Sequence, residues 1–176
     1  SESAAVRTPV VPPYVFTANE APPDAPVPFH HEMSQCTRWP RYVLFYCDTP
    51  ATAGGSTPIA RSDELARACR RQYPEACRDL TRRGIRYVRT LPPTDDPTSP
   101  IGRAWSSALN VTGADQVPRA LHERKLTGEW MKDGALRLST GTRTVFRRFG
   151  DDPEVFFNSA VAARAGWRDA RNHPHT

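Results

Sequence analysis

The sequence predicts an α+β domain, in which helices pack outside a mostly antiparallel or barrel-like sheet. Extended apolar segments come first along the chain, two amphipathic helical segments follow, and more strand segments come after them. Helices that interrupt a mostly antiparallel set of strands are typical of this class. The length of 176 residues suits a single domain with its own hydrophobic core.

The first segment of the predicted domain, residues 8–28, is rich in proline. Proline has no N–H donor and a fixed φ, so this stretch cannot form a helix or a central strand. We expect an extended loop or lid, with room for a short strand near Val15.

Two strand segments are expected within residues 29–60. The first is the short extended stretch from Val27 to Met33, and the second, from Arg41 to Asp48, is the clearest strand of the chain. Both faces of the second segment are apolar, so we expect it to be covered on both sides.

A helical insert is expected over residues 62–84. Ser62 is a suitable N-cap, and Asp63 and Glu64 would lie favourably in the first turn. Pro74 suits the first position of a second helix, which Gly84 would end.

Residues 85–160 are expected to supply further strands and a lid region. The strand candidates are 85–91, a hairpin at 130–139, 142–149 and 155–158, and a helix is expected at 117–126. The hairpin prediction depends on Asp133-Gly134, a strong signal for a tight turn.

Charge and cysteine usage limit the classes of partner. The net charge is +5, but the arginines alternate with acidic residues as on solvated helix faces, and no nucleic-acid-binding motif is found. No apolar run is long enough for a membrane span, and the first ten residues lack the order of a signal peptide, so we expect a cytoplasmic protein. The spacing of the cysteines does not match a zinc site and favours buried reduced thiols at Cys36, Cys47, Cys69 and Cys77.

The pair His30 and Glu32 is the main candidate for chemistry. On a strand, residues i and i+2 point to the same face, so both side chains would project together and His31 would point away into a structural role. One more histidine would complete a 2-His-1-carboxylate set, which leaves positions open on an iron ion. Because this spacing also occurs by chance, the pair alone is not specific.

Several ordered motifs give the pair its context. They are Pro28-Phe-His-His-Glu-Met-Ser-Gln, Trp39-Pro, Leu44-Phe-Tyr-Cys, Gly54-Gly-Ser-Thr-Pro-Ile-Ala, Ile85-Arg-Tyr-Val-Arg, the Trp130 hairpin and Phe156-Phe-Asn. Over roughly residues 14–160 the chain resembles the TauD/TfdA (clavaminate synthase-like) family of Fe(II)/2-oxoglutarate-dependent dioxygenases. The resemblance implies a double-stranded β-helix (jelly-roll, cupin-like) core with flanking helices, here a single partial oxygenase domain over residues 1–176.

The resemblance also implies roles for individual residues. His30 and Glu32 match two iron ligands, and Thr57 matches the threonine that contacts 2-oxoglutarate, after Gly54-Gly55. The side chains expected to line the substrate site are Met33, Ser34, Gln35 and, at the end of a later strand, Asn158. The expected enzyme uses Fe(II), 2-oxoglutarate and O2 to hydroxylate, desaturate or cyclise a small polar, amino-acid-like substrate of specialised metabolism, and it releases succinate.

Two elements of the family pattern are not found: the distal histidine ligand and the arginine that holds 2-oxoglutarate. The chain is then a piece of a longer oxygenase, or another chain supplies the rest, or His173 or His175 completes the iron site. Two other classes stay open, a non-catalytic binding or scaffold protein and a cupin-like isomerase that uses His30, His31 and Glu32. A small-molecule substrate is the expected partner, and the sequence is compatible with a homo-oligomer.

Overall fold

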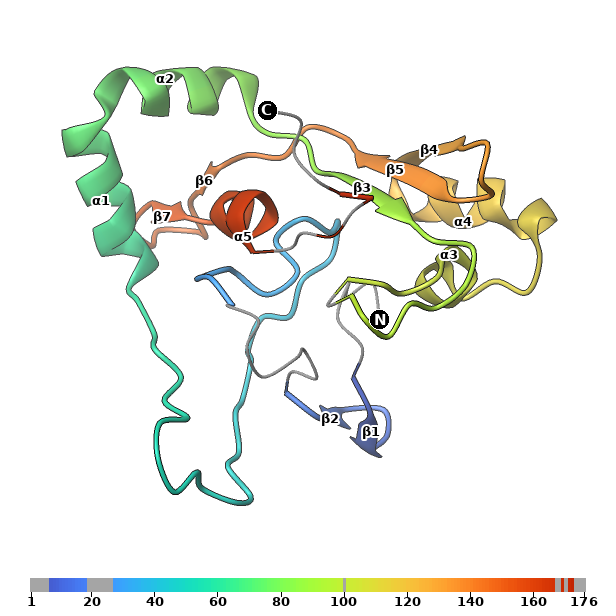
Figure 1. Cartoon of the computed structure of the whole chain (residues 1–176). Helices are drawn as coiled ribbons and strands as arrows, with labels where there is room; N and C mark the ends of the chain where they lie inside the picture. The colour runs from blue at the N-terminus through green and yellow to red at the C-terminus, as the bar shows by residue number, and fades with distance from the viewer. Residues whose placement is uncertain (1–6, 19–26, 100, 167–168, 170, 173–176) are drawn as a thin grey trace.

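The computed structural model describes residues 7–18, 27–99, 101–166, 169 and 171–172 of the chain. Within them, helices accompany three separate antiparallel sheets of two, three and two strands (Figure 1). The expected mixture of helices and antiparallel strands is confirmed. The described strands do not join into one barrel, so the jelly-roll core implied by the family resemblance is not seen in this part of the chain.

Helices α1 (Ser62–Gln72) and α2 (Pro74–Arg83) form where the sequence predicts them. Acidic side chains lie in the first turn of each helix and basic ones in the last turn, where they interact favourably with the helix dipole. Ser62 is the first helical residue rather than the N-cap: the cap is Arg61, which makes no side-chain capping bond. Gly84 ends α2 with a φ of 67°, a value that favours glycine.

The two helices pack against the small sheet of β6 (Phe146–Arg147) and β7 (Val155–Phe156). Their inner sides meet this sheet in one apolar cluster, made by Ala66, Cys77, Val145 and Phe146. Strands were expected over 142–149 and 155–158, and those observed are shorter because only two residues of each are paired.

The larger sheet contains β3 (Val88–Leu91), β4 (Leu126–Trp130) and β5 (Leu136–Thr140), in the order β3-β5-β4. Three elements adjoin it: α3 (Trp105–Leu109), the 3-10 turn η1 (Ala114–Gln116) and α4 (Val117–Arg124). A second apolar cluster joins helices to sheet through Leu109, Val117, Ala120, Leu121 and Leu136. The sequence predicted α4 but not α3 or η1, which are too short to show a helical period.

The expected hairpin joins β4 to β5. Trp130 is paired with Leu136, so the loop contains residues 131–135 and is longer than a two-residue turn. Gly134, with a φ of 80°, donates its N–H to Met131 O at 3.1 Å. The turn signal therefore located the hairpin correctly, but the hydrogen-bonded turn spans residues 131–134 instead of being centred on Asp133-Gly134.

No strand forms among residues 27–60, where two were expected. The segment 41–48 is extended but unpaired, and Leu44 and Tyr46 are 94% and 89% exposed. A strand needs a neighbour for its N–H and C=O groups, and no described residue supplies one here. The prediction of a buried strand is wrong, and so is that of a buried thiol at Cys47, which is exposed. Cys36 and Cys77 are buried and Cys69 is partly buried, and all four cysteines are free thiols.

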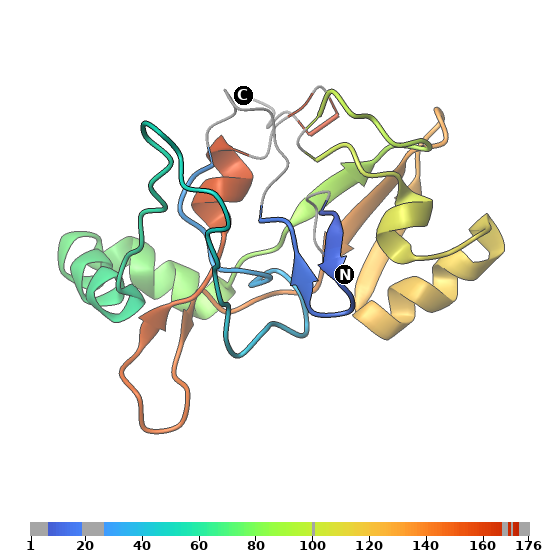
Figure 2. The ribbon, with the colours of Figure 1, turned by 90° about the horizontal axis from the view of Figure 1, so that it is seen from below.

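The remaining elements are a short hairpin near the start of the chain and a helix near its end. Within the proline-rich segment, β1 (Pro9–Val11) pairs with β2 (Val15–Phe16), close to the expected strand. Helix α5 (Ala160–Ala165) lies between the α1–α2 pair and the larger sheet in both views (Figures 1 and 2). None of the helices that the structure describes is long and apolar enough to cross a membrane.

Candidate functional site

His30 and Glu32 lie in an irregular segment that ends in a turn at residues 32–35. Residues 27–31 are not part of any strand, and Met33, with a φ of 56° in the left-handed region, turns the chain directly after Glu32. The argument that His30 and Glu32 share one strand face is therefore wrong for this structure. The structure supports the pairing of His30 and Glu32 only through their closeness along the chain.

His30 has an exposed side chain, and one of its ring nitrogens makes a hydrogen bond to the backbone. Its Nδ1–H donates to the carbonyl oxygen of Pro28 at 2.9 Å. In the neutral ring this bond places the lone pair on the other nitrogen, Nε2, which is the usual arrangement of a histidine that binds a metal.

Glu32 is held in an ion pair. Both carboxylate oxygens accept hydrogen bonds from Arg7 Nη2, at 3.2 and 3.3 Å, and both side chains are partly buried. Arg7 was not predicted, because a contact across 25 residues of irregular chain leaves no periodic signal in the sequence. A metal at Glu32 would compete with this arginine for the same oxygens.

His31 points into the protein, as expected for a structural residue. Its Nδ1 donates to Asn158 O at 3.1 Å, and its Nε2 lies 2.6 Å from the Ser62 hydroxyl, which donates to it when the ring is neutral. The ring packs on Phe157 with 5.0 Å between centroids. Burial lowers the pKa of His31 and favours this neutral ring. His31 thereby connects the His30–Glu32 segment to α1 and to the strand end after β7.

Two of the expected substrate residues, Ser34 and Asn158, lie in a buried polar network. The Ser34 and Ser159 hydroxyls are 2.7 Å apart, and Ser159 donates to His31 O at 3.0 Å. Asn158 accepts from Ala160 N–H at 2.9 Å and donates to Val145 O at 3.4 Å. These hydrogen bonds fix the turn after Glu32 against the start of α5, and the role of both residues in substrate binding stays a prediction.

Met33 and Gln35 lie on the same turn and are partly buried. The carbonyl oxygen of Gln35 accepts from Arg143 Nε at 3.1 Å, whereas its side-chain Oε1 is buried and finds no partner in the described structure. Gln35 also lines a cavity that does not include His30 or Glu32.

Thr57, the expected cosubstrate contact, lies apart from these residues in sequence, within the long loop before α1 (Figure 1). It is exposed, as are Gly54 and Gly55, whose φ values of 68° and 73° fit a turn. The structure gives Thr57 no described hydrogen bond to the His30–Glu32 segment.

The donor types at His30 and Glu32 fit two positions of an iron site, a neutral imidazole and a carboxylate. Across the described ranges, no group of three His, Cys, Asp or Glu side chains is placed to hold a metal ion. His173 and His175, considered as a third ligand, lie outside the described residues. The pair therefore fits the metal in kind but supplies two ligands of three.

Comparisons with known proteins agree with the motifs. The sequence model of the "Taurine catabolism dioxygenase TauD, TfdA family" matches residues 6–167. A clavaminate synthase-like protein of Arabidopsis thaliana is 40% identical over 172 residues, which are 97% of this chain and 52% of that protein. The dapdiamide synthesis protein DdaC of Enterobacter agglomerans is 26% identical over 144 residues, 82% of this chain and 41% of that protein. The chain thus spans about half the length of these curated relatives.

Proposed function

The chain belongs to the TauD/TfdA family of dioxygenases, and from this membership we propose that it forms the His30–Glu32 half of an Fe(II)/2-oxoglutarate-dependent oxygenase site. The observation that carries the proposal is the family match over residues 6–167, which contains His30, Glu32 and Thr57. The hydrogen bond from His30 Nδ1 to Pro28 supports it, because a histidine that binds metal through Nε2 is usually oriented by such a bond at Nδ1.

In this proposal His30 and Glu32 hold the iron and Thr57 contacts 2-oxoglutarate. When bound, iron supplies the activation of O2 that couples decarboxylation of 2-oxoglutarate to substrate oxidation. The chain's own work is to orient the ligands: Pro28 O fixes the His30 ring, and the His31–Ser62 bond fixes the segment against α1. A third histidine, and the strands that complete a jelly-roll core, are assigned to the part of the relatives that this chain does not match.

We further propose that the oxidised substrate is small, polar and amino-acid-like, handled in the cytoplasm. Met33, Ser34, Gln35 and Asn158 are the candidate contacts. The products of a hydroxylation would be the alcohol, succinate and CO2, with one oxygen atom of O2 in each of the alcohol and succinate.

A non-catalytic role is the second candidate, and the Arg7–Glu32 ion pair favours it. An arginine on the carboxylate neutralises the charge that would attract a cation. A family member that has lost iron would keep its fold and bind a small molecule or a partner without oxidising it.

An anaerobic titration with Fe(II) and 2-oxoglutarate tests the proposal. The purified intact protein, including the part to which the third histidine is assigned, should develop a visible charge-transfer band that requires both additions, and His30→Ala or Glu32→Ala should abolish it. His122→Ala is the matched control, since this exposed histidine on α4 lies outside the site. A protein that binds 2-oxoglutarate and gives no band with iron would support the non-catalytic role instead.

A further inference from the structure

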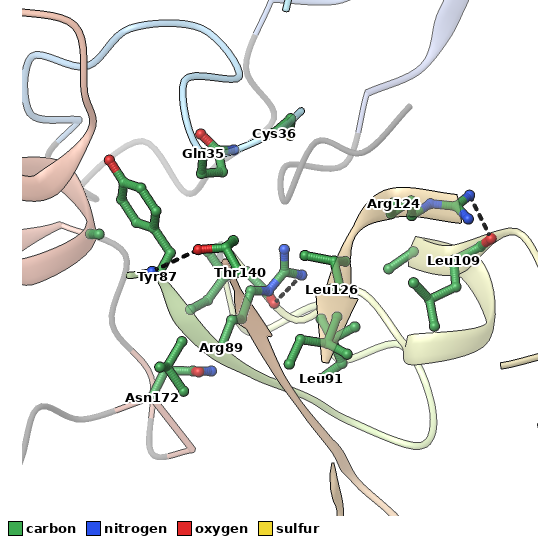
Figure 3. A pocket seen from close by; sticks show the side chains of 15 residues that line it. Gln35, Cys36, Tyr87, Arg89, Leu91, Leu109, Arg124, Leu126, Thr140 and Asn172 are labelled. Carbon is green, nitrogen blue, oxygen red and sulfur yellow. Dashed lines mark hydrogen bonds between the residues drawn. The ribbon is translucent and has the colours of Figure 1, made fainter. Parts of the chain in front are cut away.

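We propose that the cavity beside Arg89 binds a small carboxylate that carries a short apolar chain. The cavity has a volume of about 160 Å³ and lies between the β3-β5-β4 sheet, α3 and the segment that carries Gln35 and Cys36 (Figure 3). Its walls are largely aliphatic, with Leu91, Leu126 and Leu138 from the three strands. Neither His30 nor Glu32 lines it, so the proposal does not depend on iron.

Arg89 brings a positive charge into this apolar space. Its Nη2 donates to Ile101 O at 3.3 Å, and its Nε is buried without a hydrogen-bond partner in the structure as described. Burial, and then the positive charge of Arg103, lower the pKa of Arg89 to about 10, so the group stays charged at neutral pH. A buried guanidinium with one unsatisfied N–H is costly unless an anion completes it.

The described protein offers Arg89 no carboxylate. No Asp or Glu is among the residues that line the cavity. The acid that acts on it electrostatically, Asp169, already accepts from Arg171 at 2.6 Å and from Ser99 at 2.8 Å. Within the described residues, the charge of Arg89 is therefore left without a carboxylate in contact, and we assign that place to a bound anion.

The shape and chemistry of the cavity select the class of anion. A guanidinium edge matches the two oxygens of a carboxylate, and the leucine side chains suit an aliphatic body. A cavity of about 150 Å³ holds a molecule the size of benzene, so an acid of about four to six carbons fits. Phosphate fits poorly, because its remaining oxygens would face leucine side chains and lose hydration. The buried Gln35 Oε1 could accept from a hydroxyl or amino substituent of the ligand.

Butyrate titrated into the full chain tests this site, followed by calorimetry and by the Arg89 Nε–H signal in ¹H–¹⁵N spectra. We expect saturable binding that shifts this signal, with 1-butanol, acetate and phosphate each at least about tenfold weaker. Arg89→Gln should weaken butyrate by at least about tenfold. Arg137→Gln removes a charge from the exposed side of β5 and should leave binding unchanged.

A second variant keeps the test decisive if Arg89→Gln does not fold. Ala108→Leu fills the cavity from α3 and leaves Arg89 charged, so it should also abolish binding. Three results would overturn the proposal: no saturable butyrate binding to the wild-type protein, equal binding of butyrate and 1-butanol, or full binding by folded Arg89→Gln or Ala108→Leu. A failed iron titration would leave it standing, since iron takes no part in it.

Discussion

At the scale of single residues, Arg7 forms an ion pair with the Glu32 carboxylate. The pair is partly buried, with 31% and 24% of the two side chains exposed, so it is screened less than a surface pair. In the proposed iron site a metal would have to displace Arg7, so we expect the arginine to lower the apparent affinity of Glu32 for Fe(II).

Replacing Arg7 by Met should therefore tighten Fe(II) binding in the presence of 2-oxoglutarate by about two- to fivefold, the equivalent of about 0.5–1 kcal/mol. Anaerobic calorimetry measures the change, with Arg86→Met, at an exposed position before β3, as control. Weaker binding in Arg7→Met would mean that the arginine orients the carboxylate for the metal rather than competing with it.

A second residue-scale prediction concerns Glu154, which joins the loop before β7 to α1. Its oxygens accept from Arg70 Nε and Nη2 at 2.5 and 2.8 Å, and the Arg70 hydrogen bond lowers the pKa of Glu154 below its ordinary 4.5. A depressed carboxyl pKa stabilises the folded state above the unfolded pKa, and this stability is lost as pH falls through the folded pKa.

Glu154→Gln should thus lower the free energy of unfolding at pH 7 by about 0.5–1 kcal/mol, since the pair is partly exposed. The difference from wild type should shrink below about pH 4, where the wild-type carboxyl also becomes neutral. Chemical denaturation across pH measures it, with Asp151→Asn as control because that carboxylate is on an exposed turn before β7. A difference that persists unchanged at acid pH would show that the effect is not electrostatic.

The family could be predicted from the sequence, but the geometry of the candidate site could not. The types and spacing of His30 and Glu32, with the ordered motifs around them, were enough to identify the family. Their orientation was not predictable, because the segment is irregular and because Arg7 reaches Glu32 from 25 residues away.

Among the elements, the junction between α2 and β3 depends on Gly84. Its φ of 67° and ψ of −165° lie in a region that only glycine occupies easily, and a Cβ would start 2.6 Å from the backbone oxygen of Arg143. Gly84→Ala should cost about 2–3 kcal/mol in unfolding free energy, measured by chemical denaturation.

Gly141→Ala is the control for that substitution. Gly141 is exposed, lacks a positive φ, and its Cβ would meet only Arg143 Nη1 at 3.7 Å, so little change is expected. Equal losses in both variants would contradict the role given to the left-handed turn at Gly84.

An element could be predicted when the signals for it lie within its own residues. Helices α1, α2 and α4 have local signals, such as first-turn acids and first-turn prolines, and were predicted. The hairpin was found from Asp133-Gly134 for the same reason. The segment 41–48 has a strong strand pattern, but a strand needs a partner, and a pattern cannot supply one.

At the scale of the whole molecule, the exposed segment 41–48 raises the question of what covers it in solution. The chain spans about half of the curated relatives, and its most apolar segment has no pairing partner in the described structure. In the jelly-roll core proposed for the family, this segment would be a paired strand with covered side chains.

Leu44→Ser shows whether segment 41–48 is exposed or covered in solution. With Leu44 94% exposed, the substitution should change the free energy of unfolding by less than about 0.5 kcal/mol. Leu136→Ser, at a leucine 1% exposed in the second apolar cluster, should cost about 3–5 kcal/mol and sets the scale for a buried leucine. Both are measured by chemical denaturation at several protein concentrations. A large loss for Leu44→Ser that grows with protein concentration would mean that a second copy covers the segment, and a large loss independent of concentration would mean that the chain itself buries it.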